Sequence, residues 1–224
     1  MQIKLAFYAK NFARLQDGQA LNSTHIAELD QGFDFYAPQT VANMTDRTIL
    51  LAWIGQPDLT YPTDEYKWHS MLTMPRELHI EQGKIYQNLV ALQTVQVENY
   101  AEIVQLDRAY IKFDAQQQSF KLDFFNNEKG ETLMLSYDGK LLYLDRANTE
   151  QTDWMKKFDS QRYCEIARLE QVEIFFDRSV CEIFLNRGEK AMTSRFFIRD
   201  RQNVVKSDRT LSLEIAQPKA IQIK

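Results

Sequence analysis

The feature that most constrains the fold is a succession of short apolar runs separated by turn residues. Residues 172–177 and 180–185 are two such runs, and only Arg178 and Ser179 separate them, which predicts a tight hairpin. Similar short runs recur at residues 110–113, 120–125, 132–136, 140–144, 192–198, 211–215 and 220–223. So many short antiparallel strands favour a β-sandwich of two packed sheets in this half of the chain.

The first half of the chain also has a β pattern. Residues 48–54 are almost wholly apolar, which predicts a strand covered on both faces. Short strands at even spacing are typical of a propeller, a barrel or a sandwich. Only residues 151–162 have apolar spacing that suits a short helix. The chain is therefore predicted to be all-β, with one part at residues 1–90 and a β-sandwich domain at residues 91–224.

Composition excludes several classes of protein. A net charge of -4 and a pI near 5.5 argue against a nucleic-acid binder, which usually carries a basic patch. No run approaches the roughly 18 apolar residues of a membrane span, and the N-terminal residues are too polar for a signal peptide. We therefore expect a cytoplasmic protein that binds neither nucleic acid nor membrane.

The two cysteines, Cys164 and Cys181, are too few for a disulfide-dependent secreted domain. Two reduced, buried thiols are favoured, and a single bridge across neighbouring strands is the alternative. Neither the cysteines nor the three histidines show metal-ligand spacing. We expect no metal and no cofactor.

Residues 30–40 are predicted to form a strand with two unlike faces. Side chains alternate along a strand, which places Asp34 and Tyr36 on one face and Phe33 and Phe35 on the other. A polar pair is costly to bury alone, so one interpretation is that it lines a wet cavity or a site. The alternative is that local turn hydrogen bonds hold Asp34 beside a half-exposed Tyr36.

Several motifs in fixed order resemble one known family. They are residues 32–40 (GFDFYAPQT), 51–55 (LAWIG), 61–63 (YPT), 68–78 (WHSMLTMPREL), 83–87 (GKIYQ), 172–186 (VEIFFDRSVCEIFLN) with Gly188, and 193–195 (TSR). Together they resemble the latter half of the β-fructosidases of glycoside hydrolase family 32, the invertase and sucrose-6-phosphate hydrolase group. The resemblance covers nearly the whole chain.

The resemblance implies a fold and a reaction. Residues 1–90 would be the last blades only of a five-bladed β-propeller, and residues 91–224 the C-terminal β-sandwich that follows it. The family's reaction is retaining hydrolysis of terminal β-fructosyl bonds, which needs two carboxylates about 5 Å apart. The substrates implied are sucrose, sucrose 6-phosphate or a fructan.

The family's catalytic motifs are absent from these 224 residues. Trp-Met-Asn-Asp-Pro-Asn-Gly, Arg-Asp-Pro and Glu-Cys do not occur, and Arg199-Asp200 is followed by Arg201. No catalytic residue is therefore predicted, and the chain alone is expected to be inactive. A non-catalytic assembly module or carbohydrate-binding β-sandwich is the alternative. Unpaired strand edges of an incomplete propeller would favour self-association or pairing with a missing N-terminal half.

The resemblance implies a substrate-binding wall made of Asp34, Tyr36 and Trp53. For Trp53, stacking on a sugar and packing within a blade are both open, and the apolar neighbours on its face favour packing. Arg76 and Glu77 are predicted to join the last blade to the sandwich. His69 is predicted to be a satisfied core or interface histidine. Asp177, Arg178, Ser179 and Glu182 are predicted to serve the turn and ladder of the sandwich hairpin, and sugar binding is the alternative.

Overall fold

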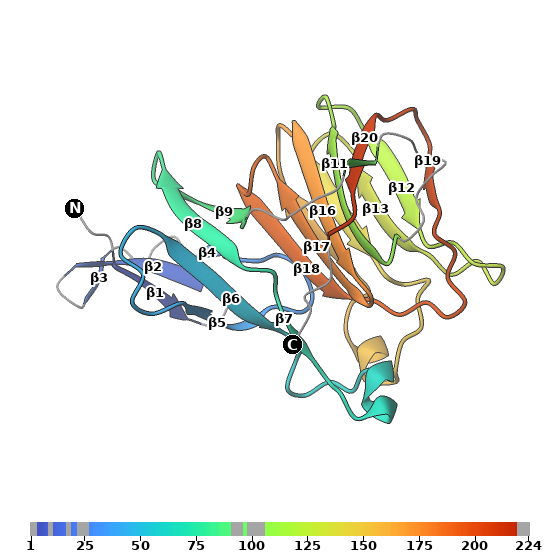
Figure 1. Cartoon of the computed structure of the whole chain (residues 1–224), viewed down its shortest axis with the longest axis horizontal. Helices are drawn as coiled ribbons and strands as arrows, with labels where there is room; N and C mark the ends of the chain where they lie inside the picture. Colours follow the sequence, from blue (N-terminus) through green and yellow to red (C-terminus); the bar gives the residue numbers. More distant parts are fainter. Residues whose placement is uncertain are drawn as a thin grey trace.

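We describe a computed structural model of the protein (Figure 1). The structure describes residues 4–8, 11–16, 19–21, 27–90, 96–97 and 106–218, and the side chains of residues 28–90 and 106–218. Four antiparallel sheets make up these residues, with two short 3-10 helices beside them. The predicted all-β class is confirmed.

Two sheets come from the first part of the chain, on the left of Figure 1. In the first sheet β1 (Lys4–Tyr8), β2 (Asn11–Gln16) and β3 (Gln19–Leu21) lie in that order, and β4 (Ala27–Glu28) pairs with β2. In the second, the order is β5 (Tyr36–Thr40), β6 (Thr48–Ile54), β8 (Arg76–Glu81) and β9 (Lys84–Leu89), with β7 (Met71–Leu72) on β6. A small apolar cluster around Phe35, Leu50 and Leu78 fixes this second sheet.

The two remaining sheets pack face to face as a β-sandwich. One has the order β10 (Gln96–Val97), β20 (Leu213–Ala216), β11 (Arg108–Asp114), β16 (Gln171–Asp177), β17 (Val180–Leu185) and β18 (Lys190–Arg195). The other has the order β15 (Gln161–Glu165), β14 (Leu141–Asp145), β13 (Leu133–Tyr137), β12 (Phe120–Phe124) and β19 (Val205–Ser207). Burial alternates along β11, β13 and β14, as expected where one face meets the core. The predicted hairpin around Arg178 and Ser179 is confirmed as β16 and β17.

Every residue of β17 is buried, in contrast to this alternation. Cys181, Ile183 and Leu185 belong to the core between the two sandwich sheets. Glu182 and Phe184 point the other way and meet Arg76 of β8. The outer face of β17 is therefore covered by the first part of the chain, and the junction between the two parts is itself a buried interface. Cys164 and Cys181 are both buried and free, as favoured from the sequence.

Two sequence-based predictions were wrong. Residues 30–35 do not form a strand: β5 begins at Tyr36, and Phe33, Asp34 and Phe35 are all buried. This segment lies instead along β18, where the amides of Phe33 and Asp34 donate to the Thr193 carbonyl at 2.8 and 3.1 Å. In place of a helix over residues 151–162, the structure has the 3-10 helix η3 (Met155–Lys157) followed by β15.

The other 3-10 helix, η1 (Pro62–Tyr66), belongs to the first part of the chain and lies beside η3 in Figure 1. Leu59 and Tyr61 at its start share an apolar cluster with Met155 and Phe197 of the sandwich. This cluster adds a second contact between the two parts of the chain.

Candidate functional site

Asp34 lies at the junction between the two parts of the chain and is fully buried. The Tyr61 hydroxyl donates to its Oδ1 at 2.5 Å, while Arg146 Nη1 and the Arg195 amide donate to Oδ2 at 2.9 and 2.7 Å. Burial, then the adjacent Asp34 charge, raises the pKa of Tyr61 far above its usual value, so the hydroxyl stays a donor. The Asp34 carboxylate therefore belongs to this junction, and a direct contact with sugar stays a prediction.

Tyr36 and Trp53 form the exposed part of the predicted wall. They pair across β5 and β6, and their rings meet edge to face with centroids 5.8 Å apart. Tyr36 is 39% exposed and Trp53 is half-buried, so the pair presents an aromatic surface to solvent. Their role in substrate binding stays a prediction.

His69 connects this aromatic pair to Asp34. Its ring lies 6.2 Å from Trp53 and 5.1 Å from Tyr61, whose hydroxyl contacts Asp34. Asp64 lies 2.8 Å from His69 Nδ1, and the His69 carbonyl accepts a hydrogen bond from Arg195 at 2.7 Å. The His69 ring is satisfied, as predicted, by Asp64 and the Gln56 carbonyl of the first part of the chain, and only its own carbonyl contacts the sandwich. The three wall residues are thus linked, with Asp34 behind the surface and Tyr36 and Trp53 on it.

Arg76 is the centre of a second buried ionic network. Its Nη1 donates to Asp30 Oδ2 at 3.0 Å and to Gln87 at 2.9 Å. Its Nη2 donates to Glu182 at 2.7 Å and to Thr193 at 2.6 Å. Burial lowers the pKa of Arg76, but Glu182 and Asp30 outweigh it and keep that pKa above its usual value. One guanidinium therefore joins both parts of the chain, as the sequence predicted for Arg76.

Among the acidic residues, the prediction for Glu77 was wrong, whereas Glu182 lies in the predicted hairpin ladder. Glu77 contacts Arg47 at 2.7 Å on the surface of the first part of the chain, and its side chain is 40% exposed. Glu182 does more than serve the hairpin ladder: its second carboxylate oxygen accepts the Met74 amide at 2.7 Å. Burial raises the pKa of Glu182, and Arg76 opposes that rise. Glu182 is thus the sandwich's contribution to the junction.

Gly188, in the turn between β17 and β18, allows close backbone contact across the junction. Its carbonyl accepts the Gln87 amide at 2.9 Å, and a Cβ at this position would lie 2.1 Å from the Gln87 carbonyl oxygen. Its φ is +87°, a region that L side chains rarely adopt. Only glycine satisfies both conditions without moving the β8–β9 hairpin.

Gly188→Ala adds a steric clash to the cost of placing alanine at a positive φ. We therefore expect it to lower the free energy of unfolding by about 1–3 kcal/mol more than a Gly→Ala substitution at a positive φ without a clash. Gly139→Ala is the matched control, because Gly139 has φ +103° and a Cβ added there would meet no atom within 4 Å. Urea unfolding of both variants measures the difference. Equal losses would show that the contact with Gln87 does not constrain this turn.

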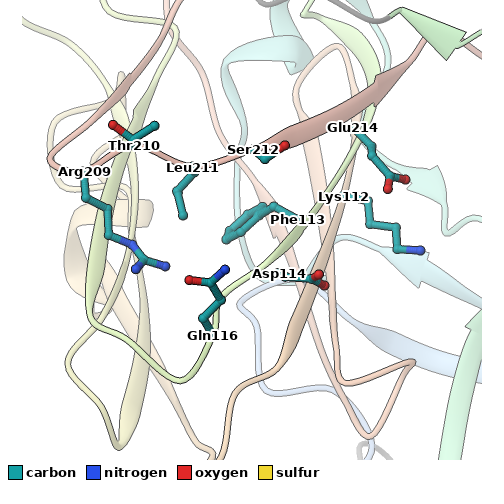
Figure 2. Close-up of a pocket in the computed structure, with 9 residues that line it drawn as sticks. All are labelled: Lys112, Phe113, Asp114, Gln116, Arg209, Thr210, Leu211, Ser212 and Glu214. Atoms are coloured by element: carbon teal, nitrogen blue, oxygen red, sulfur yellow. The ribbon is translucent and has the colours of Figure 1, made fainter.

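Other polar features do not form a site with these residues. The cavity in Figure 2, of about 160 Å³, lies between β11 and the 209–214 segment. It is lined by Lys112, Asp114, Arg209 and Glu214 among others, and none of the predicted wall residues contributes to it. In the described part of the chain, no three His, Cys, Asp or Glu residues are grouped as metal ligands. No described helix is long and apolar enough to cross a membrane.

Comparison with known proteins identifies the family. The model of the glycosyl hydrolases family 32 N-terminal domain matches residues 5–89, and the model of the family 32 C-terminal domain matches residues 78–217. The chain belongs to glycosyl hydrolase family 32. The two models meet at β8 and β9, which carry Arg76 and Gln87, so the buried network lies where the two family domains join.

Curated relatives of this family 32 chain include sucrose-6-phosphate hydrolases. The Streptococcus mutans protein is 35% identical over 198 residues, covering 84% of this chain and 41% of that protein. The Vibrio alginolyticus protein is 34% identical over 189 residues, covering 82% and 39%. The chain thus spans about two fifths of the length of the curated relatives it matches.

Solved structures have the same fold. The sucrose-6-phosphate hydrolase of Lactobacillus gasseri superposes with a TM-score of 0.76 at 26% identity, over 93% of this chain and 44% of that one. The exo-inulinase of Aspergillus awamori gives a TM-score of 0.74 at 15% identity, over 94% and 49%. The second likeness shows the fold alone.

Sequence reasoning missed the partners of Asp34. Arg195 and Tyr61 lie in motifs that carry the family resemblance, but nothing in those motifs indicates that they converge on one carboxylate. Arg146 lies outside every quoted motif and 112 residues from Asp34, so no local signal could have found it. A buried Arg near an Asp is visible only once the fold is known.

Proposed function

We propose that this chain is the C-terminal portion of a sucrose-6-phosphate hydrolase or invertase-type β-fructosidase. The observation that carries the proposal is that both family 32 domain models match the chain and meet at one buried ionic junction. The similar proteins named sucrose-6-phosphate hydrolase support the substrate class. The reaction proposed is retaining hydrolysis of a terminal β-fructosyl bond, in a cytoplasmic enzyme.

In this proposal, residues 1–90 are the last blades of a five-bladed propeller and residues 91–224 are the sandwich. Tyr36 and Trp53 supply an aromatic wall of the sugar pocket. Asp34 holds this wall from behind through Tyr61 and His69. A substitution at Asp34 would then act on sugar binding through the position of the wall.

The catalytic carboxylates are proposed to come from another polypeptide segment, since the family's three acidic motifs do not occur in these 224 residues. Exposed apolar side chains on the second sheet and just beyond the end of β5 suit burial by such a segment, or by a second copy of the chain. Leu72 is 64% exposed, Val41 43% and Ile80 42%. An assembly module that carries no chemistry is the second candidate, and it rests on the same exposed residues.

We expect the purified chain alone to show no turnover of sucrose, sucrose 6-phosphate or raffinose, because retaining hydrolysis needs two positioned carboxylates. Release of fructose, the product common to all three substrates and measured by a coupled assay, checks this. A mock purification from the same host controls for contaminating hydrolases. Turnover that co-elutes with the chain and exceeds the mock would overturn the proposed source of the carboxylates.

A further inference from the structure

The Trp53 indole lies against Gly55, which directly follows β6. Residues two apart along a strand share one face, so a side chain at position 55 would stand beside this ring. A Cβ added at Gly55 would lie 3.0 Å from both Cε2 and Nε1 of Trp53. Non-bonded carbon atoms are at their best separation at about 3.5–4.0 Å. The indole therefore occupies the space that any other residue at position 55 would need.

The backbone conformation does not explain a glycine at this position. Among the described residues, the glycines with a positive φ are Gly83, Gly130, Gly139 and Gly188, and Gly55 is not among them. Alanine at position 55 would thus avoid the strain of the left-handed region. What requires glycine at position 55 is the space that the indole fills.

A methyl group at position 55 could not turn away from the ring. Its carbon would also lie 3.1 Å from the Cβ of Ser70. Both of these Cβ atoms are bonded directly to the backbone, so no side-chain rotation moves them, whereas the Trp53 indole can rotate about its two χ angles. Gly55→Ala should therefore displace the Trp53 ring.

The Trp53 ring has a defined place among its neighbours. Its centroid lies 5.8 Å from that of Tyr36, at an interplanar angle of 73°, and 6.2 Å from that of His69. Beside Tyr36, Ala37 has φ +45°, and the β5–β6 register shifts between Tyr36 and Gln39. Bulges of this kind are over-represented next to active sites, where they re-aim a side chain. Both rings of the aromatic wall thus depend on special backbone features beside them.

We propose that Gly55 is a positioning residue of the aromatic wall. Its missing side chain sets where the Trp53 indole lies, and through the indole it sets the affinity of the wall for sugar. The statement about sugar rests on the proposed function, whereas the statement about the ring does not.

The position of the ring is tested by fluorescence of the full chain. Trp68→Phe and Trp154→Phe leave Trp53 as its one tryptophan, because the sequence has three. The two replaced rings are 41% and 45% exposed, so neither substitution leaves a large hole in the core. In this background Gly55→Ala should raise the acrylamide quenching constant of Trp53, because the ring moves off a buried backbone position. Urea unfolding shows that both proteins are folded.

The effect on sugar is tested in a fusion that places the unmatched part of the Streptococcus mutans relative before the full chain. Gly55→Ala should raise the KM for sucrose 6-phosphate by about 2- to 12-fold, the range for one aromatic contact, and leave kcat unchanged. In a Trp53→Phe background the same substitution should leave KM unchanged, because the smaller ring leaves space for the methyl group. Such non-additivity shows that Gly55 acts through Trp53.

The two measurements distinguish failure of this proposal from failure of the proposed function. Higher quenching, together with a rise in KM that disappears in the Trp53→Phe background, supports the role of Gly55. Unchanged quenching overturns it, as does an unchanged KM in the Gly55→Ala fusion or an equal rise in KM in both backgrounds. A folded fusion that is inactive with Gly55 in place contradicts the proposed function and the statement about sugar, and quenching then decides the statement about the ring.

Discussion

Arg76→Ala is expected to lower the free energy of unfolding by about 3–5 kcal/mol, the usual cost of removing one partner from a buried ionic network. The substitution leaves Asp30 and Glu182 buried without their counter-ion, and both carboxylates are at most 1% exposed. It also removes the guanidinium between the rings of Phe35 and Phe184, each 4.9 Å from it. Urea unfolding followed by tryptophan fluorescence measures the loss.

Arg47→Ala is the matched control, because it also breaks an Arg–Glu pair but at the surface. The Arg47 and Glu77 side chains are 34% and 40% exposed, so the loss should be no more than about 1 kcal/mol. Arg76→Lys keeps the charge but not the planar fork, so it should recover only part of the stability. If Arg76→Ala and Arg47→Ala cost the same, the junction does not depend on this network.

The sandwich could be predicted because its signals are local. Alternating burial in β11, β13 and β14 follows directly from alternating apolar residues, and the Arg178-Ser179 turn marks the hairpin. Strands β12 to β15 and β16 to β18 each pair with the next strand in the chain, which short-range turn chemistry already indicates. The pairings of β11 with β16 and β20, and of β12 with β19, join distant parts of the sequence and had no such signal.

The segment 30–35 could not be predicted, because its partners are distant in the chain. Its backbone pairs with Thr193, and Gly32 is required there since a Cβ would lie 2.1 Å from the Thr193 carbonyl oxygen. Alternation predicted that Asp34 and Phe33 would face opposite ways, but both are buried by contacts to Arg146 and β18. Tertiary contacts override a strand pattern here.

The candidate site also contains some residues whose positions could be predicted from the sequence and others whose positions could not. Tyr36 and Trp53 come together because β5 and β6 are consecutive in the chain and pair with each other. A pairing of consecutive strands can be predicted from the sequence. Arg76 was predicted at the junction from the family resemblance, whereas Glu77, its neighbour in the same motif, contacts Arg47 instead. Successive strand residues point to opposite faces, and only the fold shows which face the sandwich covers.

We expect a fusion protein to make this chain part of an active enzyme. This chain matches 41% of the Streptococcus mutans relative. In the fusion, the part of that relative that this chain does not match would precede this chain in a single polypeptide. We expect hydrolysis of sucrose 6-phosphate, because the fusion joins the family's acidic motifs to the aromatic wall and the sandwich. Replacing the Glu of the Glu-Cys motif by Gln should reduce kcat by about 10²- to 10⁴-fold.

Two further fusions compare a substitution in the proposed aromatic wall with a substitution at the surface. In the fusion, Tyr36→Ala should raise the KM for sucrose 6-phosphate if the aromatic wall binds sugar. Arg47→Ala should leave both kcat and KM unchanged. Circular dichroism confirms that each fusion is folded before its kinetics are compared.

The measurement that decides the central claim is the rate of sucrose 6-phosphate hydrolysis by the folded fusion, compared with the chain alone. Turnover by the fusion and none by the chain is the predicted result. It would show that residues 1–224 supply a competent wall and sandwich to a family 32 active site completed by another segment. A folded fusion without turnover, or turnover by the chain alone, would contradict the claim.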